Sequence, residues 1–205
     1  MGSSRALRRY VSVGITRGVA QCSRSLAAGE VWARTHELDK HVEPTSITSG
    51  EEMERALANA RLREGDVLHL ETHGAWDDDF FAFWFGRSTE RFVPRRAPEA
   101  LFAPSLVLVG ACHAGTEAGL RVLAGLFDPG VPLIACAGDA TWQQVANRVL
   151  PALDEADVVR RGVPPRNDGR SQLLVERLSG DARNVSWLLG QADLGWVRLP
   201  ERRTA

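Results

Sequence analysis

The sequence predicts a mixed α/β fold, with a mostly parallel central sheet and helices on both of its faces. Strand-like runs alternate with helix-like runs along most of the chain, which is the pattern of parallel strands joined by crossover helices. The strand candidates in the middle of the chain are apolar at nearly every position, as expected for strands covered on both faces. With 205 residues, the chain is long enough for one substantial domain and short for two, so a single domain over residues 1–205 is expected.

The N-terminal part is expected to hold two strands with a helix between them. Tyr10 to Ile15 alternates and is rich in β-branched residues, which predicts the first strand. A helix is expected from about Gly18 to Trp32. The run from His41 to Ile47 predicts a short strand near a sheet edge, because Pro44 cannot donate a ladder hydrogen bond.

A capped helix and a buried strand follow. Ser49 is expected to cap the helix, and the acidic Glu51 and Glu52 suit its positive end. The run from Val67 to Thr72 then predicts a strand that stops at His73.

The middle of the chain combines an aromatic segment with a central strand. A polar loop is expected from Trp76 to Asp79, and the aromatic run Phe80 to Phe85 then predicts a strand or hairpin. Arg87 to Ala103 is rich in Arg and Pro and is expected to be an irregular connection. Ser105 to Gly110 is nearly all apolar and predicts a central strand. The remaining expected elements are a helix over Thr116 to Phe127, a strand over Val131 to Cys136, helices over Trp142 to Leu153 and Ser171 to Leu178, and a last strand over Trp187 to Leu199.

Composition and charge argue against several classes of partner. The formal net charge is -1, so no overall basic field points to nucleic acid. The basic clusters Arg5 to Arg9 and Arg202-Arg203 are expected to be solvated ends. No apolar run approaches the ~20 residues of a membrane helix, and the stretch after Met1 to Arg9 is too broken for the core of a signal peptide. No nucleic-acid or membrane partner is expected, and the cytoplasm is the default compartment.

The cysteines and acidic residues show no pattern of a metal site. Cys22, Cys112 and Cys136 form neither a disulfide framework nor a metal spacing, and in a reducing compartment each is expected to be a free thiol. The acidic run Asp77 to Asp79 lacks the spacing of an EF-hand. No metal and no other cofactor is therefore expected.

Two chemically active side chains stand where predicted parallel strands end. Ligands of parallel sheets bind beyond the carboxyl ends of the central strands, and that rule selects His73, Cys112 and Asp139. A thiol attacks a carbonyl only as the thiolate, so it needs an exposed position and a base. Cys112 has such a position, and His73 ends another strand of the same sheet. We expect Cys112 to be a nucleophile and His73 its base.

Gly74 has a role of its own in this hypothesis. Without a side chain, its backbone N–H can approach a substrate closely and form an oxyanion hole together with the N–H of Cys112. The start of the helix after Cys112, near Gly115-Thr116, would favour the same negative charge.

Cysteine and histidine residues in such positions also have purely structural interpretations. A cysteine after an apolar strand is more often a packed core residue, and a lone histidine at a strand end is usually structural. His113 is a competing base, although neighbouring residues at a strand end point in different directions. His69 is expected to be packed in the strand body, Cys136 to be an inert core thiol, and Cys22 to be an ordinary helix or loop residue.

An apolar strand ending in His-Gly, followed by an apolar strand ending in Ala-Cys, resembles the caspase-like cysteine peptidases. That group contains caspases, legumain, gingipains, separase and the bacterial CHAT proteins. The segments that look closest to CHAT domains are Asp66 to Gly74, Leu106 to Gly115 and Gly130 to Ala135, and the similarity covers roughly Tyr10 to Leu153. The chain departs from the common CHAT pattern at Gly110 and His113, where Ser or Thr is usual.

The resemblance implies a caspase–hemoglobinase fold and cleavage of a protein or peptide substrate through a thioester. It implies that His73 is the general acid/base and Cys112 the nucleophile, in a protein of bacterial defence or signalling that a regulatory partner could control. Asp139 then falls where this group builds the pocket for the residue before the scissile bond, and a carboxylate there would favour Arg or Lys. The competing interpretation is that Asp139 caps the helix beginning near Thr141.

Two other classes of function stay open at this stage. One is a catalytically silent caspase-like module that acts in assembly or signalling. The other is a flavodoxin- or receiver-like domain that binds a small ligand at the same sheet edge, although the stretch Gly14 to Gly18 matches no nucleotide-binding fingerprint.

Overall fold

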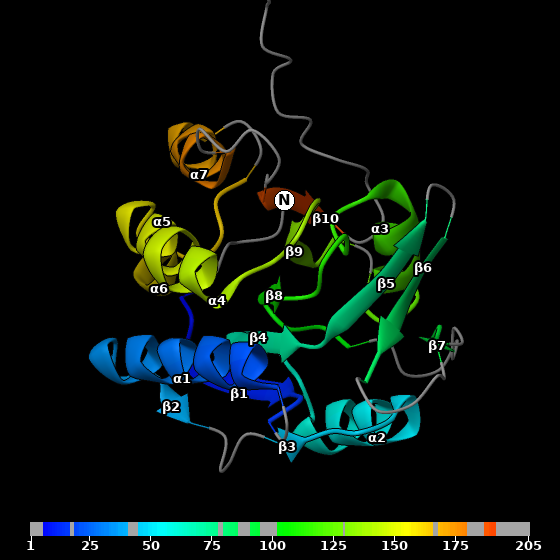
Figure 1. Ribbon diagram of the computed structural model, residues 1–205. Helices are drawn as coiled ribbons and strands as arrows, with labels where there is room; N and C mark the ends of the chain where they lie inside the picture. The colour runs from blue at the N-terminus through cyan, green and yellow to red at the C-terminus, as the bar shows by residue number, and fades with distance from the viewer. Residues whose placement is uncertain are drawn as a thin grey trace, which may run out of the picture.

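The computed structural model describes residues 6–16, 19–40, 45–77, 80–85, 91–94, 102–128, 130–165, 168–179 and 187–191. Within them the chain forms a mixed α/β structure around a twisted sheet, as predicted (Figure 1). The strands of this sheet run in the order β10-β9-β8-β4-β1-β2, with β3 also paired to β1. Their bounds are β1 Arg9–Gly14, β2 Asp39–Lys40, β3 Thr45–Ser46, β4 Asp66–Glu71, β8 Leu106–Val109, β9 Pro132–Cys136 and β10 Trp187–Gln191.

The centre of the sheet is parallel. β1, β4, β8 and β9 pair with one another in parallel, whereas β10 pairs with β9 antiparallel. Of the strand predicted over 41–47, β3 is present, and residues 41–44 lie outside the described part, whereas β2 precedes that range and was not predicted. The last predicted strand is present over Trp187–Gln191, and the rest of its predicted range also lies outside.

Helices cover both faces of the sheet, which explains why its central strands are almost entirely buried. Along β8, Val107 and Val109 join a core with helices α2 (Gly50–Ala60) and α3 (Glu117–Leu123). Leu106 and Leu108 face the other way. They join a core that includes residues of α1 (Ala20–Thr35), the π-helix Val145–Val149, α5 (Leu150–Glu155), α6 (Val158–Arg161) and α7 (Gly169–Ser179). The short α4 (Trp142–Gln144) leads into the π-helix, and Figure 1 shows α2 and α3 on the right of the sheet and the other helices on its left.

A second, smaller sheet begins directly after β4 in the chain. It consists of β5 (His73–Asp77), β6 (Phe80–Trp84) and β7 (Arg91–Phe92), paired in antiparallel order. The expected polar loop over Trp76 to Asp79 was therefore wrong for its first two residues, because pairing with the aromatic strand β6 extends β5 to Asp77. Figure 1 shows this hairpin projecting from the edge where β4 ends.

The helices match the sequence with three differences. α2 has Ser49 as its N-cap, accepting from the N–H of Glu52, as predicted. α3 ends at Leu123 rather than near Phe127, because the chain turns there and Phe102 forms a bridge with Phe127. The predicted helix over Trp142 to Leu153 contains a π-helical turn before Pro151, and α6 was not predicted at all.

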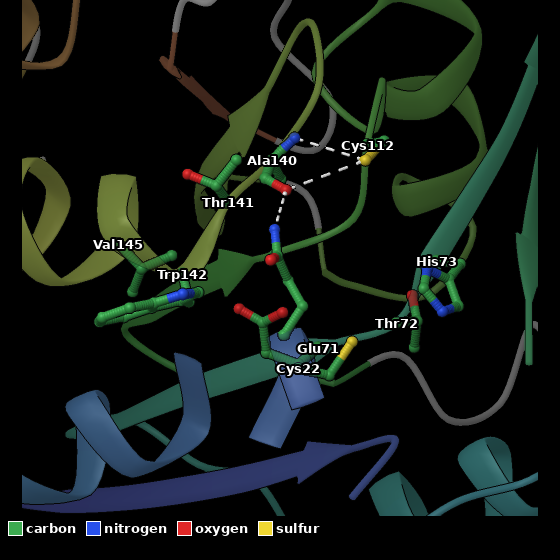
Figure 2. Close-up of a pocket in the computed structure, with 11 residues that line it drawn as sticks. Cys22, Glu71, Thr72, His73, Cys112, Ala140, Thr141, Trp142 and Val145 are labelled. Carbon is green, nitrogen blue, oxygen red and sulfur yellow. Dashed lines mark hydrogen bonds between the residues drawn. The ribbon is translucent and has the colours of Figure 1, made fainter. Parts of the chain in front are cut away.

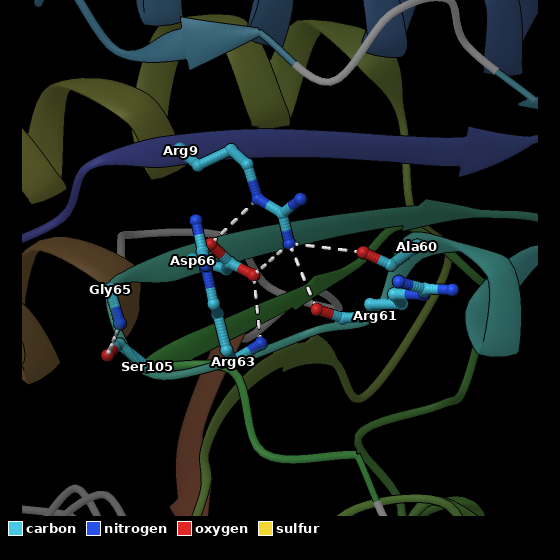
Figure 3. A network of polar contacts seen from close by, with 7 residues as sticks. All are labelled: Arg9, Ala60, Arg61, Arg63, Gly65, Asp66 and Ser105. Carbon is cyan, nitrogen blue, oxygen red and sulfur yellow. Dashed lines mark hydrogen bonds and ion pairs between the residues drawn. The ribbon is translucent and has the colours of Figure 1, made fainter.

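A partly buried ion pair joins the elements at the amino end of the sheet (Figure 3). Arg9 Nε donates to Asp66 Oδ1 at 2.9 Å, and its guanidinium also donates to a second Asp66 oxygen and to the carbonyl of Ala60. Asp66 accepts from the N–H of Arg63 at 2.8 Å. Arg9 is therefore not part of a solvated end, as its basic cluster suggested, but connects β1 to the turn between α2 and β4.

Candidate active site

The residues singled out at the ends of β4 and β8 line one cavity. It has a volume of about 150 Å³, and its lining includes His73, Cys112, Glu71 and Trp142. In the view of Figure 2, Cys112 and His73 lie towards the right of the cavity and Trp142 and Val145 towards the left. β4 and β8 are neighbouring parallel strands, so their carboxyl ends, and the side chains that follow them, share one edge of the sheet.

Cys112 lies in the tight turn after β8. Its thiol is half-buried, and the N–H of Ala140 points at Sγ from 3.4 Å. Burial raises the pKa of Cys112, and the charge of Asp139 adds to the rise, whereas the hydrogen bond from Ala140 lowers it. The sulfur is thus a protonated thiol at neutral pH, with one amide donor that would stabilise a thiolate once it forms.

His73 is the first residue of β5 and packs against Trp84, directly opposite it on β6. The two ring centroids are 5.1 Å apart. Burial lowers the pKa of His73, because desolvation disfavours the charged imidazolium. A neutral imidazole can accept a proton, so His73 has the protonation state of a general base at neutral pH.

Gly74 brings the small sheet against the turn that carries Cys112. A Cβ atom at Gly74 would lie 1.9 Å from the carbonyl oxygen of Cys112 and 2.9 Å from Phe81. Only glycine allows this approach. Within the described residues, no backbone carbonyl accepts from the N–H of Cys112.

His113 takes a strained backbone conformation that separates its side chain from the thiol before it. Its φ is 60°, in the left-handed region that non-glycine residues rarely adopt. The ring stacks on Trp76 at a centroid distance of 4.5 Å, and Nε2 lies 3.5 Å from Asp139 Oδ1. His113 is thus occupied by Trp76 and Asp139, and it does not line the cavity.

Asp139 does not cap the helix that begins at Trp142. The cap of the helix that begins at Trp142 is Thr141, which forms a capping box with Gln144. The Asp139 side chain is 81% exposed, pairs with His113, and is not among the residues that line the cavity. The capping interpretation was wrong, and the structure gives no support to a pocket role for Asp139.

The other cysteines are poor nucleophiles. Burial raises the pKa of Cys22 and of Cys136 to about 12. Cys136 is a core thiol on β9, as expected. Cys22 is also buried, but it lies on α1 and lines the cavity. Among the three thiols, Cys112 is therefore the one suited to react.

A buried polar network lies beside the cavity, and sequence reasoning missed its most acidic member. His69 is buried as expected, with Nδ1 2.6 Å from the hydroxyl of Tyr10 and Nε2 2.9 Å from Glu71 Oε1. Ser25 also donates to Glu71. The signal in the sequence was a glutamate at the end of the buried strand before His73. Burial of a carboxylate is costly, so such a residue usually has a structural or functional role.

Comparisons with known proteins do not assign the chain to a family. No protein-family model matches it, and a search of curated proteins finds no match. Within the described residues, no group of three or more His, Cys, Asp or Glu could hold a metal ion. In the same part of the chain, no helix has the length and apolar character needed to cross a membrane.

Proposed function

We propose that this chain is a caspase-like cysteine endopeptidase with a caspase–hemoglobinase fold, in which His73 and Cys112 form the catalytic dyad. The observation that carries the proposal is that the His-Gly and Ala-Cys segments follow neighbouring parallel strands and that both reacting side chains line one cavity. The motif resemblance and the apolar strands before each segment support the same interpretation.

The chemistry follows from the neutral state of both groups. His73 removes the proton of the Cys112 thiol as Sγ attacks the carbonyl carbon of a bound peptide. The tetrahedral oxyanion accepts hydrogen bonds from the N–H groups of Cys112 and Gly74. The intermediate collapses to a thioester while His73 gives its proton to the leaving amine, and a water molecule activated by His73 then hydrolyses the thioester.

The test is cleavage of a peptide library by the wild-type chain and three variants. Cys112→Ala is expected to reduce cleavage to background, and His73→Gln to lower kcat/KM by about 10²–10⁴-fold, the usual contribution of a general base. His113→Asn is the matched control, because Asn tolerates the left-handed backbone of that position and His113 lies outside the cavity.

The outcomes separate the proposed enzyme from the alternatives. Cleavage by purified Cys112→Ala at the wild-type rate would show that Cys112 is not the nucleophile and would remove the proposal. Absence of cleavage by the wild-type chain on every peptide would instead favour a silent caspase-like module. If His113→Asn rather than His73→Gln abolished cleavage, His113 and not His73 would be the general base.

A further inference from the structure

The cavity beside Cys112 has a buried acidic lining that the proposed dyad does not use. Glu71, the last residue of β4, is 3% exposed, and Thr72 next to it is 2% exposed. Both line the same cavity as Cys112. Figure 2 shows them in the lower half of the site, below Cys112.

The Glu71 side chain is held from behind by Ser25 and His69. Ser25 donates its hydroxyl to Oε1, and His69 Nε2 lies 2.9 Å from the same oxygen. The hydroxyl of Tyr10 lies 2.6 Å from His69 Nδ1 and fixes that ring. Gly110 leaves room for the carboxylate, because a Cβ there would lie 1.8 Å from Oε1. Burial raises the pKa of Glu71, and the contacts with His69 and Ser25 lower it in part, so a cation that enters the cavity would favour the charged carboxylate.

Two features of Glu71 and Thr72 indicate that a ligand binds beside them. In the described part of the chain, the partners of Glu71 are a hydroxyl and an imidazole, and no guanidinium or ammonium group pairs with it. The hydroxyl of Thr72 is buried and has no hydrogen-bond partner, although buried polar groups are nearly always paired. A cation with several N–H donors would give the Glu71 carboxylate a charged partner and the Thr72 hydroxyl a hydrogen-bond donor.

We propose that Glu71 and Thr72 bind the ammonium or guanidinium group of a Lys or Arg side chain. Its place in catalysis rests on the proposed function: the bound side chain would belong to the residue before the bond that Cys112 attacks. The inference moves this recognition from Asp139, which is exposed and paired with His113, to a carboxylate inside the cavity.

The binding test uses the Cys112→Ala chain, so that it does not depend on turnover. Agmatine carries a guanidinium, cadaverine carries ammonium groups, and butylurea is a neutral analogue; binding of each is measured by calorimetry or NMR. We expect agmatine or cadaverine to bind and butylurea not to bind. Adding Glu71→Gln should weaken binding of the cation by about tenfold or more, because the charge-assisted bond is lost.

Matched variants separate the site from general electrostatics. Glu117→Gln removes an equal charge from an exposed ion pair and should change binding less than about twofold, because exposed charges are well screened. Thr72→Val keeps the side-chain shape and should weaken binding measurably, which keeps the test informative if Glu71→Gln fails to fold. Cation binding that both folded variants leave intact, or that Asp139→Asn removes instead, would overturn the inference.

The same set of chains distinguishes this inference from the proposed function. Peptide cleavage without any preference for Lys or Arg would leave the peptidase proposal standing and remove Glu71 as its selector. If cation binding depends on Glu71 but the wild-type chain cleaves no peptide, the cation site stands and the peptidase proposal is contradicted.

Discussion

At the scale of single residues, the environments of Cys112 and His73 oppose a preformed ion pair. Burial raises the pKa of the thiol and lowers the pKa of the imidazole. Both shifts favour neutral groups, since desolvation penalises whichever form is charged. The thiolate would then form only as His73 accepts the proton during attack, with the N–H of Ala140 ready to stabilise it.

This leads to a prediction about alkylation. The rate at which iodoacetamide labels Cys112 should rise about tenfold per pH unit up to a midpoint above the ordinary thiol value of 9.0, because the thiolate is the reacting form. Labelled peptides are quantified by mass spectrometry across the pH range. Cys22 and Cys136, with pKa values of about 12, should lag behind.

The control for the labelling experiment is Cys112→Ala, which should lack the fast phase. Rapid labelling of Cys112 that stays constant from mildly acidic to neutral pH would contradict the prediction. It would indicate a thiolate–imidazolium pair already present in the resting protein.

The sequence indicated the two residues of the proposed dyad, but it did not indicate a role for Glu71 beside them. His73 and Cys112 could be predicted because each follows an apolar run, and parallel strands end at a common edge. Glu71 could not be assigned, because its neighbours in space, Ser25 and Gly110, lie 46 and 39 positions away along the chain. The ion pair of Asp139 with His113 could not be predicted for the same reason, because the two residues lie 26 positions apart along the chain.

At the scale of elements, the hairpin of β5 and β6 is a structural support for the turn of Cys112. Gly74 touches the carbonyl of Cys112, and Phe81 and Phe83 of β6 are buried beneath the hairpin. The strands β4 and β8 were predictable from their own composition. β5 was not, because its exposed Trp76 and the polar Asp77 become a strand only through pairing with β6.

The contact at Gly74 predicts a coupled loss of stability and activity. Gly74→Ala places a methyl group 1.9 Å from a backbone oxygen, so the hairpin and the turn must separate. We expect a loss of about 1–3 kcal/mol in the free energy of unfolding, as for other overpacked sites. Denaturant unfolding and kcat/KM are measured on the same preparation, and kcat/KM should fall because the oxyanion donors move apart.

Gly169→Ala is the matched control for this substitution. A Cβ at Gly169 meets nothing within 4 Å, and this residue begins α7 away from the cavity. Its stability and activity should therefore stay close to wild type. A Gly74→Ala chain with unchanged unfolding and unchanged kcat/KM would contradict the close approach of hairpin and turn.

At the scale of the whole molecule, the two ends of the sheet have different tasks. The carboxyl ends carry the cavity with His73 and Cys112, whereas the amino ends are joined by Arg9 and Asp66. The sequence could predict the first arrangement from strand ends alone. It could not predict the second, because Arg9 and Asp66 are 57 positions apart and a terminal basic cluster is usually solvated.

The separation of the two ends predicts that stability can be lowered without changing the site. Asp66 is 1% exposed, and its carboxylate meets the guanidinium of Arg9 and the N–H of Arg63. Asp66→Asn removes the charge that pairs with the partly exposed Arg9, and the loss of a hydrogen bond to a charged group costs about 1.5–3 kcal/mol. Denaturant unfolding should show such a loss, whereas Glu117→Gln, from an exposed pair with Arg121, should cost at most about 1 kcal/mol.

Asp66 and Glu71 are the two ends of β4, so kcat/KM per folded molecule should stay at the wild-type value in Asp66→Asn. A fall in kcat/KM without unfolding would mean that β4 transmits strain along its length to His73.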